Sequence, residues 1–105
     1  MKILNWELER GQIILYSVKK IEVINLTALE YKAFKKLKSG KLQRTQDLLR
    51  TMYDYKTKLD RDNTNLKGLI WRLNTKIKPI GHIDSRYKWG YIFNAKIGER
   101  EDGEK

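Results

Sequence analysis

A sharply marked helix start at Thr27 is the feature that most constrains how this chain can fold. Thr27 and Glu30 have the spacing of a capping box, in which each side chain accepts a hydrogen bond from the backbone N–H of the other residue. Gly40 is a natural C-terminal stop for the helix. Between these limits apolar residues recur at helical spacing, namely Tyr31, Phe34 and Leu37. The pattern predicts a first helix between Thr27 and Gly40.

The segment before this helix, residues 1–26, has the pattern of short strands. Residues 12–16 and 21–24 are rich in β-branched and aromatic side chains, with Lys19-Lys20 at the turn between them. Gly11 marks an earlier turn, after residues 3–8. We expect an antiparallel sheet of three or four strands.

Two more helices are expected after Gly40. Thr45 can cap the second, whose buried face is formed by Leu48, Leu49 and Met52. Residues 54–62 show no clear period and are expected to be a loop. The third helix is expected from about Asn63 to about Lys78, before Pro79, with one apolar stripe of Leu66, Ile70, Leu73 and Ile77.

A β-hairpin is expected at the end of the domain. Residues 82–85 and 91–94 form two extended segments, and residues 86–90 form a turn with two cations and two aromatic rings. Ile83, Tyr91 and Phe93 are expected to face the core. The fold class is therefore α+β: a winged helix-turn-helix over residues 1–97, with an N-terminal sheet (1–26), three helices (27–78) and a wing hairpin (82–94). Residues 98–105 are expected to be a charged, disordered tail.

Positive charge is concentrated in the predicted helices and wing. The chain of 105 residues has a net charge of +10, of which +11 lies in residues 27–97, +1 in residues 1–26 and −2 in the tail. Such an excess suits a polyanion, above all nucleic acid, although a lysine-rich solvated surface is the plainer alternative. No apolar run is long enough for a membrane span, so a cytoplasmic protein is expected.

Catalysis is not expected from this composition. The chain has no cysteine and one histidine, and no nucleophile paired with a base is visible. No cofactor and no metal site are therefore expected.

The face of the third helix opposite its apolar stripe carries no acid and is the expected contact with nucleic acid. Arg72 and Thr75 lie at its middle, where an arginine can read guanine through two hydrogen bonds; a solvated arginine is the alternative. Gly68 allows either close approach of DNA or close packing against another helix, and Trp71 either stacks on DNA or lies at the rim of the core. One of Asn63, Thr64 and Asn65 is expected to cap the helix where its free amides suit a phosphate.

The full set of expected contacts lies on this helix, in the wing and near the second helix. The DNA-binding candidates are Thr64, Asn65, Lys67, Gly68, Trp71, Arg72, Thr75, Ser85, Arg86, Tyr87 and Lys88. The phosphate-contact candidates are Thr45, Tyr53, Asn63 and Lys78.

Four stretches in the same order resemble the winged-helix effector domain of OmpR/PhoB-type response regulators and of the related ToxR/CadC-type regulators. They are Leu26-Thr27-Ala28-Leu29-Glu30, Thr45-Gln46-Asp47-Leu48-Leu49 followed by Tyr53, the pattern from Leu66 to Ile77, and the pattern Ile83-x-Ser85 with Gly90-Tyr91-x-Phe93. Together with the expected N-terminal sheet over residues 1–26, which also fits this family, they cover residues 1 to about 95, without a receiver domain. Asn74, Tyr87 and Lys88 depart from the family pattern, so the family's contacts at these positions do not carry over.

The resemblance implies a sequence-specific regulator of transcription that binds double-stranded DNA. The third helix then enters the major groove, and the wing, residues 85–90, contacts the flanking backbone or minor groove. It also implies that two copies bind adjacent half-sites and that the loop between the second and third helices contacts RNA polymerase. The alternative from another class is a winged-helix module that binds a protein or RNA.

Overall fold

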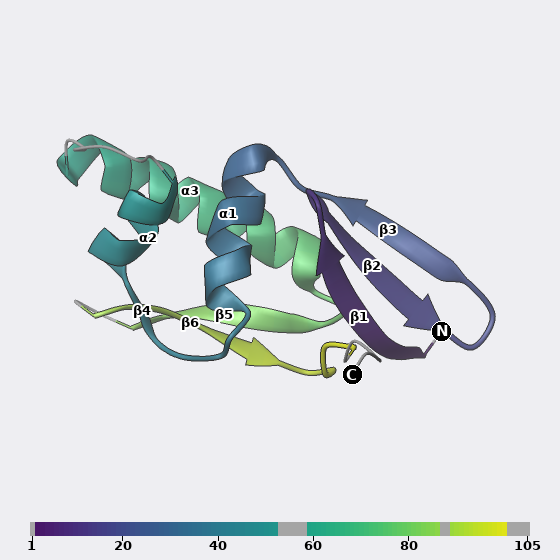
Figure 1. Ribbon diagram of the computed structural model, residues 1–105. Helices are drawn as coiled ribbons and strands as arrows, with labels where there is room; N and C mark the ends of the chain where they lie inside the picture. The colour runs from purple at the N-terminus through teal and green to yellow at the C-terminus, as the bar shows by residue number, and fades with distance from the viewer. Residues whose placement is uncertain (1, 53–58, 87–88, 101–105) are drawn as a thin grey trace.

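The structure is a computed structural model that describes residues 2–52, 59–86 and 89–100; for residues 59–64 it describes the backbone alone. This part of the chain forms an α+β fold with three helices and two small antiparallel sheets. The first sheet lies at one end of the molecule, and the helices lie beside the second sheet (Figure 1).

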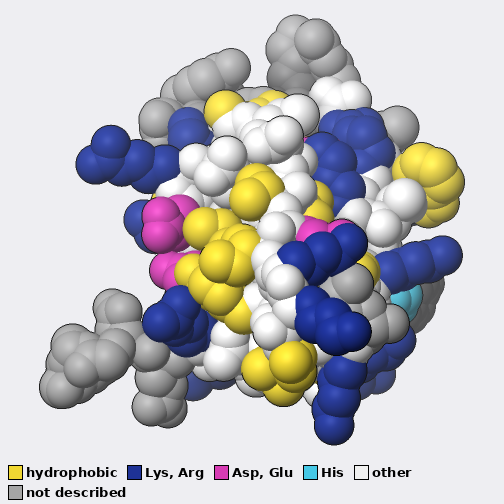
Figure 2. All heavy atoms as spheres, turned by 90° about the vertical axis from the view of Figure 1, so that its right-hand side faces the viewer, with side chains coloured by type: hydrophobic (Ala, Val, Ile, Leu, Met, Phe, Trp, Pro, Cys, Tyr) yellow, Lys and Arg dark blue, Asp and Glu magenta, His cyan; other side chains and the backbone are white. Residues whose placement is uncertain are grey.

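The first sheet contains three strands in the order β1-β2-β3: β1 (Ile3–Glu9), β2 (Gln12–Ser17) and β3 (Ile21–Asn25). Its inner face buries Trp6, Ile13 and Leu15. Three large apolar side chains of its last turn and strand are exposed, namely Val18, Ile21 and Val23. Figure 2 shows hydrophobic side chains gathered at this end of the molecule. The expected N-terminal sheet is confirmed, with three strands.

Helix α1 (Ala28–Leu37) begins with the expected capping box. The Glu30 backbone N–H donates to Thr27 Oγ1 at 3.2 Å, and the Thr27 backbone N–H donates to Glu30 Oε1 at 2.9 Å. Gly40 follows with a left-handed φ of +82°, as suits a residue that ends a helix.

A short strand that the pattern did not predict, β4 (Gln43–Arg44), follows α1 and pairs with the final hairpin. Helix α2 (Thr45–Met52) comes directly after it. Thr45 is the first residue of α2, so its expected place as the preceding cap is shifted by one position. The expected buried side chains of α2 are confirmed: Leu48, Leu49 and Met52.

Helix α3 (Leu59–Ile77) begins four residues before the expected start, so the prediction of a loop over 54–62 is wrong from Leu59 onward. The sequence contains a physical reason: residues 59–62 hold no glycine or proline, and Asp60 and Asp62 are of the type that the helix dipole favours in a first turn. Asn63, Thr64 and Asn65 therefore all lie inside the helix, so the prediction that one of them caps it, beside free amides that suit a phosphate, is wrong. The predicted stripe of Leu66, Ile70, Leu73 and Ile77 is buried, together with Leu69.

The C-terminal hairpin consists of β5 (Gly81–Arg86) and β6 (Gly90–Ala95), and β6 lies between β5 and β4. Arg86 pairs with Gly90, and the Trp89 N–H donates to the Arg86 carbonyl at 2.8 Å, so the turn is tighter than the expected span of 86–90. The expected inward side chains are confirmed as buried: Ile83, Tyr91 and Phe93.

An aromatic cluster joins the two sheets and α1. The ring centroids of Phe34 and Phe93 are 5.2 Å apart in an edge-on arrangement, and Trp6 lies 5.6 Å from Phe34. All three rings are buried, so one contact group connects β1, α1 and β6.

Gly98–Arg100 are not part of a free tail, which corrects the expectation for these residues. The Trp6 indole N–H donates to the Ile97 carbonyl at 2.6 Å, and the Arg100 backbone N–H donates to the Trp6 carbonyl at 2.5 Å. Lys38 pairs with Glu99 at 2.6 Å. The C-terminal segment is thus attached to β1 as far as Arg100, and the rest of the expected tail lies outside the described residues.

Candidate nucleic-acid interface

The outward face of α3 carries most of the candidate residues. At about 100° per residue, Gly68, Trp71 and Thr75 lie at its middle, with Arg72 on one side and Lys67 on the other. All except the half-buried Gly68 are exposed, as are the candidates Asn65 and Lys78. The structure therefore brings these residues together on one helix face. Thr64 and Asn63 lie on α3 by their backbone, and their side chains are outside the described part of the chain.

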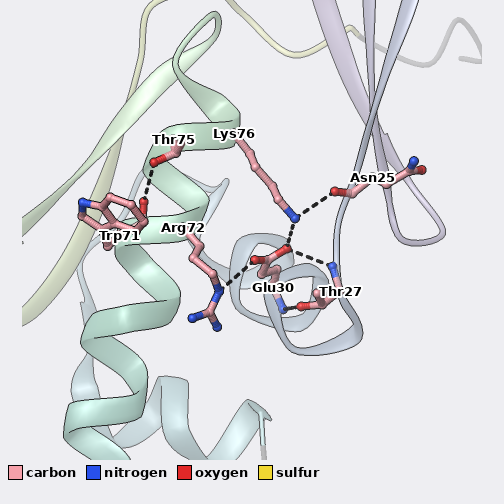
Figure 3. A network of polar contacts seen from close by, with 7 residues as sticks. All are labelled: Asn25, Thr27, Glu30, Trp71, Arg72, Thr75 and Lys76. Atoms are coloured by element: carbon pink, nitrogen blue, oxygen red, sulfur yellow. Dashed lines mark hydrogen bonds and ion pairs between the residues drawn. The ribbon is translucent and has the colours of Figure 1, made fainter.

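A buried carboxylate from α1 approaches one side of this face (Figure 3). Glu30 is fully buried, and its Oε2 lies 3.4 Å from Arg72 Nε. Its Oε1 accepts a hydrogen bond from Lys76 Nζ at 2.6 Å, and the same ammonium donates to the Asn25 carbonyl at 3.1 Å. The helix has no acid between Asn65 and Lys78, but tertiary packing gives Arg72 an acidic partner that the helix pattern did not reveal.

Glu30 stays charged to lower pH than an ordinary glutamate. Burial alone raises its pKa, but hydrogen bonds from Lys76 and from the Thr27 backbone outweigh burial, so the pKa lies below its ordinary value. The ionised carboxylate can therefore hold both Arg72 and Lys76 at neutral pH.

This shift predicts a pH dependence of stability. Because the pKa is lower in the folded state, Glu30 stabilises the fold above its unfolded pKa of about 4.3, and this contribution is lost as the pH falls through the folded value. We expect the difference in free energy of unfolding between wild type and Glu30→Gln to shrink as the pH falls from neutral through the unfolded pKa of Glu30 and on through its lower folded pKa. Urea unfolding at several pH values measures it; a difference that stays constant contradicts the prediction.

Trp71 and Thr75, at the middle of the face, differ in their surroundings. The Trp71 side chain is 70% exposed, which excludes its alternative place at the rim of the core. The Thr75 hydroxyl donates to the Trp71 carbonyl at 3.1 Å, so Thr75 presents its methyl group and an acceptor oxygen. The middle of the face therefore combines a large exposed ring with a small polar side chain.

Gly68 is not required by packing. A Cβ at this position would meet Arg72 Nη1 at 3.6 Å, an ordinary contact, and nothing closer. The alternative of close packing against another helix is therefore wrong. A glycine inside a helix costs about 1 kcal/mol of stability relative to alanine, and packing does not account for this cost at Gly68.

The hairpin is fixed to α3 by an amide clamp that the sequence pattern did not identify as functional. Asn74 Nδ2 donates to the Ile83 carbonyl at 3.0 Å, and the Ile83 N–H donates to Asn74 Oδ1 at 2.7 Å. Because β5 is an edge strand, these bonds satisfy backbone groups that no strand pairs. The position where Asn74 departs from the family pattern thus has a structural role, which fixes how the hairpin lies against α3.

The far end of the hairpin is exposed. Ser85, Arg86 and Trp89 all lie at the surface, with Trp89 65% exposed. Of the other candidates, Tyr53, Tyr87 and Lys88 lie outside the described residues, and Thr45 lies on α2 rather than on this face. The exposed Trp89 was not among the predicted contacts, although its place in an aromatic, basic turn signals it.

In the part of the chain that the structure describes, no three His, Cys, Asp or Glu side chains are grouped as metal ligands. None of its helices is long and apolar enough to span a membrane. No known family model matches the sequence, and no curated protein is similar enough to count as a relative.

Proposed function

We propose that this protein binds double-stranded DNA in a sequence-specific manner and regulates transcription. The observation that carries the proposal is the exposed face of α3, which has no acid between Asn65 and Lys78 and presents Trp71, Arg72 and Thr75 to solvent. The width of an α-helix fits the major groove, where each base pair offers a distinct pattern of donors, acceptors and methyl groups.

In this proposal the domain is a winged helix. Helix α3 lies in the major groove, and the exposed end of the β5–β6 hairpin reaches the flanking backbone or minor groove with Arg86 and Trp89. The order of sheet, three helices and hairpin supports this assignment. Because Asn74 joins α3 to β5, it then sets the distance along the duplex between the contact of α3 and the contact of the hairpin.

The remaining parts of the proposal rest on the family resemblance. Two copies bind adjacent half-sites, and the connection between α2 and α3 contacts RNA polymerase. The composition, rather than the resemblance, is the ground for the last part of the proposal, a cytoplasmic protein that acts without a cofactor and without catalysis.

Selection from a random duplex pool tests the proposal directly. The expected result is one enriched sequence, which binds the protein at least about tenfold more tightly than its scrambled version. Arg72→Ala is expected to weaken the enriched duplex more than the scrambled one, since a bidentate contact to guanine contributes about 1–3 kcal/mol of discrimination. No enrichment, or tighter binding to structured RNA or an acidic protein, favours the alternative of an RNA-binding or protein-binding module.

Gly68→Ala is expected to change stability and binding in opposite directions. The added methyl group removes the helix cost of glycine and stabilises the fold by up to about 1 kcal/mol, because it meets no close neighbour. If Gly68 allows DNA to approach the helix backbone, the same methyl group weakens binding to the enriched duplex. Urea unfolding and DNA titration of one sample measure both effects; unchanged affinity contradicts close approach at Gly68.

A further inference from the structure

Arg72 is anchored at one end of its guanidinium group. Its Nε lies 3.4 Å from Glu30 Oε2, while 54% of its side chain is exposed. Figure 3 shows the two terminal nitrogens pointing away from Glu30. An arginine reads guanine through two parallel hydrogen bonds, so it needs two free N–H groups in a fixed plane. Within residues 2–52, 65–86 and 89–100, the one charged partner of Arg72 is Glu30, at Nε, so these two groups are available.

Glu30 is a rigid anchor because its own position is determined by other contacts. Its Oε1 accepts hydrogen bonds from the Thr27 backbone and from Lys76. Its Oε2 is buried and, within the described residues, accepts no hydrogen bond that meets ordinary geometry, so the Arg72 cation is the group that faces it. A buried carboxylate oxygen without a close hydrogen-bond donor is energetically costly, and a nearby cation such as Arg72 lowers this cost.

We propose that Glu30 is a positioning residue that holds Arg72 in the orientation for reading a guanine base. The inference rests on the proposed function and deepens it, because it names the base that Arg72 selects and the residue that makes the selection possible. Anchoring at Nε restricts a long, flexible side chain before DNA arrives, so less conformational entropy is lost on binding. Without the anchor, Arg72 remains a cation that contacts any phosphate.

If Glu30 competes with DNA for Arg72 instead of positioning it, removing Glu30 changes the affinity for DNA in the opposite direction. If Glu30 only competes with DNA for Arg72, its removal releases the cation and strengthens binding to every duplex. If Glu30 positions Arg72, its removal weakens binding to the preferred duplex and leaves binding to a scrambled duplex unchanged or slightly tighter, because one negative charge is lost. The ratio of the two affinities separates these roles.

The experiment compares Glu30→Gln with wild type on the enriched duplex, its scrambled version, and an enriched duplex in which the candidate guanine is replaced by 7-deazaguanine. Glutamine is compatible with the capping box, and circular dichroism and thermal unfolding check that the variant folds. Glu22→Gln is the matched control, since it removes an exposed acid of β3, paired with Lys20, with the same change in net charge. Should Glu30→Gln not fold, Glu30→Asp, which retracts the carboxylate by one methylene, replaces it with the same expected loss.

We expect Glu30→Gln to reduce the preferred-to-scrambled affinity ratio at least about fivefold, which is the lower limit for one bidentate base contact. In an Arg72→Ala background, or with 7-deazaguanine, the same substitution is expected to leave the ratio unchanged. A ratio equal to that of Glu22→Gln, or an equal rise in affinity for both duplexes, overturns the inference. If wild type itself does not discriminate between the duplexes, the proposed function fails first, and the two failures are distinct.

Discussion

Phe34→Ala is expected to cost about 3–5 kcal/mol of the free energy of unfolding. Phe34 is fully buried and contacts the rings of Trp6 and Phe93, so its loss leaves a cavity where both sheets meet α1. A domain of this size is stable by about 5–15 kcal/mol, so this substitution is expected to remove a large share of the free energy of unfolding. Urea unfolding measures the cost.

Val18→Ala is the matched control for this prediction. Val18 is 77% exposed, and surface substitutions of this kind usually change stability by less than about 0.5 kcal/mol. If Phe34→Ala costs no more than Val18→Ala, the aromatic cluster does not hold the sheets and α1 together as described.

Gly90→Ala is expected to cost about 2–6 kcal/mol, combining backbone strain with overpacking. Gly90 has a φ of +146°, and a Cβ there would lie 2.0 Å from the Gln43 carbonyl oxygen and 2.8 Å from Arg44 Cα. These are backbone atoms of β4, so the clash is relieved by separating β4 from β6. Thermal unfolding and hydrogen exchange of the β4 and β6 amides measure the loss.

Two other glycines provide controls for Gly90→Ala. A methyl group added at Gly98 would have no heavy atom within 4 Å, so Gly98→Ala is expected to change stability little, and Gly68→Ala is expected to stabilise the fold. Equal effects at Gly90 and Gly98 contradict the close approach of β4 to the hairpin.

Local patterns are sufficient to predict most elements of the fold. The capping box, the strand segments, the stripe of α3 and the inward face of the hairpin depend on residues close in the sequence, and each is present. The pattern places the start of α3 too late because six polar residues, 60–65, separate Leu59 from the apolar stripe that begins at Leu66. Strand β4 has two residues and no pattern of its own, since it depends on pairing with β6.

The candidate site is predictable as a helix face but not as a set of contacts. The exposure of Arg72 and Thr75 follows from helical period, whereas the approach of Glu30 to Arg72 joins residues on α1 and α3 that only packing brings together. The clamp of Asn74 on β5 and the attachment of Glu99 and Arg100 near Trp6 are also tertiary contacts without a local signal.

The salt dependence of DNA binding tests the central claim most directly. The affinities for the enriched duplex and its scrambled version are measured over a range of KCl concentrations. About six phosphate contacts predict a slope near −5 in the plot of log affinity against log salt for the enriched duplex, with its affinity above that of the scrambled duplex throughout. A flat slope, or equal affinity for both duplexes and for an unrelated polyanion, contradicts sequence-specific binding of DNA by this protein.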